Sequence, residues 1–189
     1  DSTKGWKSIA GSTDDTTGLA PTYIVATGGS VATTGDYKVH TFTSNANFTV
    51  CSIGNASGGP NKVDYMVIAG GGGSGGSAGV ATGSGGGGAG GYRESPGAET
   101  GCYTVSPRGA APAAAITVSA QAYPIVIGGG GGSGGSGYGN TGSSGSTSSG
   151  LGISSAGGGG GSGYNAPASG NGGSGAGGAA WGPSNSKGT

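Results

Sequence analysis

The segment 63–72, with the sequence Val-Asp-Tyr-Met-Val-Ile-Ala-Gly-Gly-Gly, decides which fold this chain is expected to adopt. Apolar side chains alternate on both faces of the run 61–69, with Met66 and Ile68 sharing one face, so the run predicts a β-strand covered on both sides. A glycine tract begins directly after this strand. The segment 123–128, Tyr-Pro-Ile-Val-Ile-Gly, repeats the design of a strand that runs into glycine.

Glycine supplies 53 of the 189 residues, although its average share in soluble domains is about 7%. Charged residues make up only 7% of the chain, whereas the average is about 25%. Such a chain must offset a large backbone entropy cost on folding. Its glycine tracts therefore either stay disordered as linkers or pack so closely that backbone hydrogen bonds replace side-chain burial. Similar length and spacing favour a bundle of similar rods, with tracts at 70–76, 83–91, 128–139, 157–163 and 170–178.

Several further short segments have the alternation typical of half-buried antiparallel strands. The runs 22–27, 36–43, 47–51 and 115–119 each predict a strand, and residues 44–46 predict the hairpin loop between the second and the third. No stretch has helical periodicity with caps. The expected fold is all-β, with short antiparallel, sandwich-like strands combined with the glycine rods and almost no α-helix.

The chain is expected to divide into a polar N-terminal arm or linker at 1–29 and a glycine-rich domain at 30–189, whose pattern is expected to continue beyond Thr189. Seven basic and seven acidic residues cancel, and no basic patch is visible, so nucleic acid is not an expected partner. The longest apolar run, 66–69, is far shorter than a membrane-spanning segment, so membrane insertion is not expected either.

The sequence lacks the patterns on which enzyme chemistry depends, and we expect no catalytic residue, cofactor or metal site. The stretch 70–75 formally matches a dinucleotide-binding loop, but glycine and serine follow where that chemistry needs a helix. His40, the only histidine, has no nucleophile signature beside it. One histidine and two distant cysteines lack metal-ligand spacing. The protein is therefore expected not to be an enzyme.

The two cysteines, Cys51 and Cys102, have two interpretations. In a chain poor in charge and rich in Ser and Thr, one pair is compatible with a disulfide formed in an oxidising or extracellular setting. Two buried cysteines that act as small apolar side chains are the alternative. The sequence leaves both open.

Large aromatic residues follow the glycine tracts, at the expected ends of the rods. On a scaffold poor in side chains they are candidates for contact with a receptor or a sugar; alternatively, they cover the rod ends or stack against neighbouring subunits. The segment 139–154, rich in Ser, Thr and Asn, is the expected recognition loop. The candidate contact residues are Tyr138, Asn140, Thr141, Tyr164, Asn165 and Trp181.

The order of these elements resembles the glycine-rich domain of phage tail-fibre-like proteins, a domain found in marine phages that include those of cyanobacteria. The resemblance rests on the strands at 36–43 and 48–50, on the strand that enters glycine at 63–72, and on the stretch Gly-Gly-Gly-Gly-Ala-Gly-Gly-Tyr-Arg at 85–93. It covers residues 30–189. The arrangement is also similar to the tail-tip adhesins of T-even-type phages and to the glycine-rich domain of the anaplastic lymphoma kinase ectodomain.

The resemblance implies that the tracts form left-handed polyglycine II helices packed side by side. Such a helix has three residues per turn and no internal hydrogen bonds, so its amides must bond to neighbouring rods, which only glycine lets approach closely. The resemblance further implies a phage virion structural protein, a tail fibre or adhesin that takes part in host attachment. Its expected location is the virion or the extracellular space.

The implied partners are a host cell-surface polysaccharide or outer-membrane protein, other virion proteins, and further copies of the chain, with a trimer favoured. The alternative function is a purely structural subunit that binds no receptor, such as a capsid decoration or head-fibre protein or an extracellular filament subunit. Low charge and a surface rich in Ser, Thr and Asn suit both functions.

Overall fold

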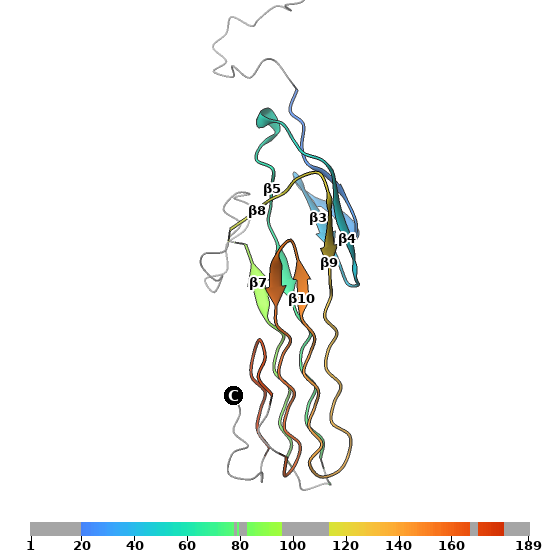
Figure 1. The fold of residues 1–189 in the computed structure, drawn as a ribbon, viewed down its shortest axis with the longest axis vertical. Helices are drawn as coiled ribbons and strands as arrows, with labels where there is room; N and C mark the ends of the chain where they lie inside the picture. Colours follow the sequence, from blue (N-terminus) through green and yellow to red (C-terminus); the bar gives the residue numbers. More distant parts are fainter. Residues whose placement is uncertain (1–19, 78, 80–82, 96–113, 167–169, 180–189) are drawn as a thin grey trace, which may run out of the picture.

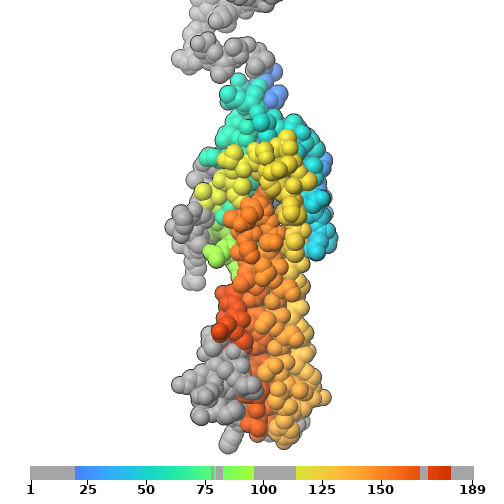
Figure 2. All heavy atoms as spheres, in the orientation of Figure 1, coloured from blue at the N-terminus to red at the C-terminus, as the bar shows by residue number. Residues whose placement is uncertain are grey.

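The segments in which a strand runs into glycine mark the junction between a β-rich head and a bundle of glycine rods (Figure 1). The computed structural model describes residues 20–77, 79, 83–95, 114–166 and 170–179. In the space-filling view the head is broader than the shaft that the rods form (Figure 2). The molecule is therefore long and narrow, with the strands at one end and the far ends of the rods at the other.

The head is built around a three-stranded antiparallel sheet in the order β1–β4–β9. Its strands are β1 (Val25–Thr27), β4 (Ala46–Ser52) and β9 (Ala122–Ile125). Phe48 and Val50 lie two residues apart on the middle strand, so they point to the same side of the sheet, and both are buried. With Val118 they form the apolar core, and partly buried side chains complete it: Ile24, Ala26, Phe42, Val63, Ile116, Tyr123, Ile125 and Leu151.

The head begins earlier in the chain than the sequence indicates. The predicted N-terminal arm ends at residue 29, but β1 already pairs with β4 in the central sheet. Most of the arm, residues 1–19, lies outside the described part of the chain. The boundary between arm and head therefore lies before Val25.

A hairpin of β2 (Ser30–Thr34) and β3 (Tyr37–Thr41) is attached to this sheet. The predicted hairpin across residues 44–46 is wrong, because β3 pairs with β2, whereas β4 pairs with β1 and β9. Sequence analysis missed β2 because its side chains are small and exposed. His40 of β3 joins the hairpin to the core: its Nδ1 donates to the carbonyl oxygen of Gly28 at 2.8 Å, and its ring meets Phe48 edge-on with centroids 5.1 Å apart.

Three shorter antiparallel pairs connect the central sheet to the rods. They are β5 (Lys62–Val63) with β8 (Ile116–Thr117), β6 (Met66–Ile68) with β7 (Tyr92–Glu94), and β10 (Ser148–Gly150) with β11 (Ile153–Ser155). One turn of 3-10 helix, η1 (Ala56–Gly58), is capped by the side chain of Asn55. The described residues contain no α-helix.

The strand predicted at 61–69 differs from the expectation in two ways. It is divided into β5 and β6, which belong to different sheets. It is also covered on one face only: Val67 is partly buried, while Met66 and Ile68 on the other face are 64% and 54% exposed. Apolar side chains on both faces of a strand do not show which face the rest of the chain covers.

Five rods run along the shaft, and the glycine tract at 170–179 folds back on itself beside them (Figure 1). We number them rod 1 (69–77), rod 2 (83–91), rod 3 (128–137), rod 4 (140–147) and rod 5 (156–164), followed by the rod hairpin (170–179). Rods 1, 3 and 5 are parallel to one another, and rods 2 and 4 return antiparallel to them. Rods 1 and 3, which follow the two segments of strand-then-glycine design, therefore lie side by side in the same direction.

Hydrogen bonds between the rods recur every three residues, as the three-residue turn of polyglycine II requires. Rod 5 donates to rod 1 through the pairs Gly158–Gly70, Gly161–Gly73 and Tyr164–Gly76. Rod 5 is also hydrogen-bonded to rods 2 and 4 and to both arms of the rod hairpin, and its residues 158–163 are all buried. Neighbouring rods thus satisfy backbone groups that would be costly to bury unpaired.

Close approach of the rods is the reason that the tracts are glycine. A β-carbon at Gly73 would collide with the carbonyl group of Gly132 in rod 3, and one at Gly158 would collide with the carbonyl group of Gly88 in rod 2. The rods therefore pack backbone against backbone. The prediction of an all-β fold with short antiparallel strands and packed glycine rods is confirmed.

Two predictions about individual tracts are wrong. The segment 139–154 is not a loop, because it comprises rod 4 and most of the β10–β11 hairpin. The tract 170–178 is not one rod: its first arm runs antiparallel to rod 5 and its second arm parallel to it. Serine-rich sequence is typical of loops, yet a rod needs glycine only where a neighbour approaches. In rod 4, Gly142 and Gly145 meet rod 1, while Ser143 and Ser146 are exposed.

Candidate binding site

The far end of the bundle, which we call the tip, brings together three segments that are distant in sequence. They are residues 76–77 at the end of rod 1, the turn 137–140 between rods 3 and 4, and the turn 164–166 after rod 5. Backbone hydrogen bonds of 2.7–3.1 Å connect them, with donor–acceptor pairs Gly76–Asn140, Gly137–Ser77, Gly139–Tyr164 and Tyr164–Gly76. The tip is therefore a fixed surface rather than a set of independent loops.

Tyr138 occupies a special position in this surface. Glycines with positive φ precede and follow it, Gly137 at 124° and Gly139 at 74°, and the left-handed region is one that other residues seldom adopt. The amides of both glycines are hydrogen-bonded, to Ser77 and Tyr164. The side chain between them is nevertheless 70% exposed. The backbone around Tyr138 is held on both sides while its ring is presented to solvent.

The ring of Tyr164 lies next to that of Tyr138. The ring centroids are 5.3 Å apart and the planes are inclined by 56°, within the range in which aromatic pairs attract each other. The two tyrosines come from different turns, so only the folded bundle brings them together. Tyr164 is half-buried, and Tyr138 provides the more exposed ring.

Asn140 lies at the tip as predicted, but its amide has a structural task. The Nδ2 group donates to the carbonyl oxygens of Gly135 and Ser136 at 3.2 Å and 2.9 Å. These bonds close the turn that carries Tyr138. The side chain therefore supports the aromatic pair. A ligand could form hydrogen bonds only with the part of the amide that these two bonds do not use.

Asn165 and Thr141 are the remaining described candidates, and both are exposed. Asn165 has a φ of 55°, a conformation that Asn tolerates better than most residues. It lies in a turn closed by a 3.0 Å hydrogen bond from the amide of Ala166 to the carbonyl of Gly163. Thr141 directly follows Asn140 at the start of rod 4. Their polar side chains flank the aromatic pair in sequence.

Two of the predicted site residues, Trp181 and Cys102, lie outside the described residues. Cys51, the other predicted disulfide partner, is exposed at the end of β4, and its Sγ contacts the carbonyl oxygen of Thr49 at 3.8 Å. The alternative of a buried apolar cysteine therefore does not hold for Cys51. The disulfide stays a prediction.

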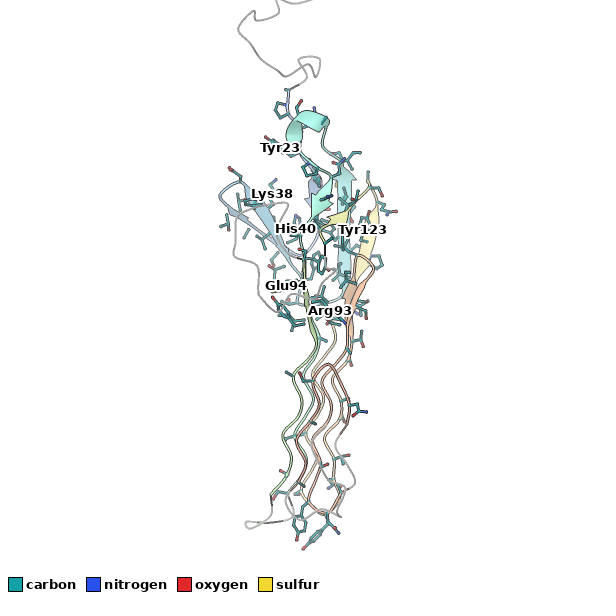
Figure 3. The ribbon with its side chains drawn as sticks, turned by 90° about the vertical axis from the view of Figure 1, so that its left-hand side faces the viewer. Tyr23, Lys38, His40, Arg93, Glu94 and Tyr123 are labelled. Atoms are coloured by element: carbon teal, nitrogen blue, oxygen red, sulfur yellow. The ribbon has the colours of Figure 1, made fainter. Side chains whose placement is uncertain are left out.

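Charge is distributed unevenly between head and tip. The described residues carry charged side chains only in the head, at Asp36, Lys38, Lys62, Asp64, Arg93 and Glu94; Figure 3 labels three of them, with Lys38 in the head and Arg93 and Glu94 where the head meets the rods. Rods and tip are neutral throughout the described part of the chain. A ligand of the tip would therefore find hydroxyls, amides and aromatic rings, and no charged side chain from these residues.

One cluster in the head was missed by sequence analysis. The fully buried hydroxyl of Ser95 donates to Asp64 Oδ1 at 2.7 Å and accepts the amide hydrogen of Tyr65 at 3.0 Å. Nearby on β7, the hydroxyl of Tyr92 donates to Glu94 Oε2 at 2.6 Å. The residue types alone give no signal of this cluster, because Ser95 follows β7 by one residue and pairs with a segment thirty residues earlier.

Two other kinds of feature are absent from the described residues. No group of three or more His, Cys, Asp or Glu side chains in these ranges could hold a metal ion. No helix among the same residues is long and apolar enough to cross a membrane.

The tip thus combines an aromatic pair in which Tyr138 is exposed, a backbone connected by hydrogen bonds and neutral polar groups at the end of a shaft. Comparisons of the chain with protein-family models, with curated proteins and with solved structures gave no match.

Proposed function

We propose that this chain is a bacteriophage virion protein, a tail fibre or adhesin, whose tip contacts the host surface. The single observation that carries the proposal is Tyr138: its ring is 70% exposed although hydrogen bonds hold the glycines on both sides of it. Folding alone gives no reason to present a large aromatic ring on a fixed backbone. Rigid aromatic residues are typical of surfaces that bind a partner.

The architecture supports the same function. Rods that pack through backbone hydrogen bonds place the tip far from the head, at about 3 Å per residue along each rod. A head at one end could join other virion proteins while the tip stays free. The resemblance of the segments 36–43, 63–72 and 85–93 to phage tail-fibre-like proteins agrees with this division of tasks.

The test is binding of the fluorescently labelled chain to a panel of intact bacteria and cyanobacteria. We expect saturable binding to a narrow set of strains, and loss of this binding in Tyr138→Ala. Tyr23→Ala is the matched control, because Tyr23 is 67% exposed and lies at the opposite end of the molecule (Figure 3). Equal binding of both variants and the native chain would reject the tip as the attachment site.

A purely structural subunit is the second candidate, and one observation favours it. Met66 and Ile68 expose apolar side chains on one face of β6, and contact between copies of the chain would cover such a face. Size-exclusion chromatography with light scattering distinguishes the two functions. Trimers or filaments without binding to any strain would favour the structural subunit; a trimer that also binds cells would agree with a fibre.

A further inference from the structure

We infer that the tip binds a neutral carbohydrate, with a sugar ring stacked on Tyr138, whose ring packs against that of Tyr164. The inference rests on the proposed attachment function and adds the chemical class of the ligand. Its starting point is the geometry of the pair: two rings 5.3 Å apart, inclined by 56°, on turns that backbone hydrogen bonds connect. The backbone that carries the Tyr138 ring is already fixed before a ligand binds, so binding costs little conformational entropy.

The chemistry of the rings favours a sugar. The face of an aromatic ring carries partial negative charge, and the C–H groups on one face of a pyranose carry partial positive charge. A sugar can therefore stack on the exposed face of Tyr138 while its hydroxyl groups remain at the edge. Thr141 directly follows the turn 137–140, and Asn165 lies in the turn 164–166; both are exposed, and their polar side chains can form hydrogen bonds with those hydroxyls.

The neutral side chains of the described tip residues favour one class of sugar. Recognition of a carboxylate, sulfate or phosphate group usually uses Arg or Lys. Neither residue type occurs in the rods or turns of the described part of the chain. A neutral polysaccharide therefore matches this surface better than a polyuronate or a phosphorylated glycan.

The size of the aromatic surface argues against a protein as the main ligand. A stable protein–protein contact buries about 800 Å² on each partner, whereas aromatic side chains bury about 150–250 Å² each. Two tyrosines, one of them already half-buried, supply less than this. One or two sugar units need a smaller surface, and repeated units along a polysaccharide raise the apparent affinity when many fibres bind at once.

The first experiment is affinity electrophoresis of the full chain in gels that contain dextran, mannan or galactan, with alginate as the charged comparison. We expect at least one neutral polymer to retard the native chain and alginate to leave it unretarded. Tyr138→Ala and Tyr164→Ala should each weaken the retardation by about tenfold or more, as loss of a central aromatic contact does. Tyr23→Ala should behave like the native chain, and circular dichroism should show all variants folded.

A second experiment separates failure of this inference from failure of the proposed function. Cells that bind the chain are treated either with periodate, which oxidises sugar diols, or with protease. Loss of binding after periodate alone supports the neutral carbohydrate. Binding that depends on Tyr138 but is lost only after protease overturns the carbohydrate and leaves the attachment function intact. No retardation by any neutral polymer, together with periodate-resistant cell binding, also overturns it.

Discussion

The carbonyl oxygen of Ser143 in rod 4 lies against the α-carbon of Gly131 in rod 3, where any other residue would carry its β-carbon. At the next residue, Gly132, no atom of another rod lies within 4 Å of the place that a β-carbon would occupy. Two adjacent glycines of one rod therefore differ in whether packing requires them.

This difference predicts opposite effects of the same substitution. Gly131→Ala should destabilise the bundle by on the order of 1–3 kcal/mol, because the new methyl group collides with backbone that cannot move freely. Gly132→Ala should be neutral or stabilising by up to about 1 kcal/mol, because it only restricts the unfolded chain. Thermal and urea unfolding of the two variants measures the difference. Equal destabilisation would contradict the observed packing of rods 3 and 4.

Asn140→Ala should loosen the tip without unfolding the head. The variant removes two hydrogen bonds to the carbonyls of Gly135 and Ser136, each worth about 0.5–1.5 kcal/mol. We expect faster hydrogen exchange at residues 135–139 and unchanged exchange in β4. Thr141→Ala serves as the control, and similar exchange at the tip in both variants would show that the amide of Asn140 does not hold the turn.

Ser95→Ala should destabilise the head. Its hydroxyl donates to Asp64 Oδ1 and accepts from the amide of Tyr65, and loss of a buried partner costs about 1–3 kcal/mol for each group left unpaired. Ser95→Thr keeps the hydroxyl and tests whether the hydrogen bonds or the volume matters. If chemical denaturation gave the same midpoint for Ser95→Ala as for the native chain, the cluster would have no role in stability.

The apolar core of the head is small, so single changes within it should be costly. Val50, 2% exposed, contrasts with Val31, 52% exposed on the β2–β3 hairpin. Val50→Ala should lower the unfolding free energy by on the order of 2 kcal/mol through lost burial and a residual cavity, and Val31→Ala should change it little. Comparison of the melting temperatures of the two variants tests this core assignment.

Some features of the fold could be predicted because they depend on local pattern. Alternation identified β4 around Phe48, and the transition from a strand into glycine at Gly70 and at Gly128 marked the start of rods 1 and 3. Pairing partners could not be predicted in this way. Strand β4 pairs with β1 and β9 rather than with β3, and short strands of similar composition do not specify which partner covers them.

The candidate site shows the same limit. The positions of Tyr138 and Tyr164 at the ends of glycine tracts predicted that both belong to the site, and their rings are in contact at the tip. The bridging role of Asn140 and the exposed face of Met66 depend on contacts that only the folded chain makes. Rod 4 could not be recognised from its sequence, because the serines at its outward-facing positions give it the composition of a loop.

The central place of rod 5 has a consequence for how the protein is made. Rods 1, 2 and 4 all hydrogen-bond to residues 156–164, which a ribosome adds only after every one of those rods has been synthesised. Until then, rods 1, 2 and 4 lack one of the neighbours to which they hydrogen-bond, and contacts distant in sequence form slowly. We expect the nascent chain to keep these tracts solvated and to complete the bundle in one late step, with rod 5 as the segment that commits the whole shaft to its final order.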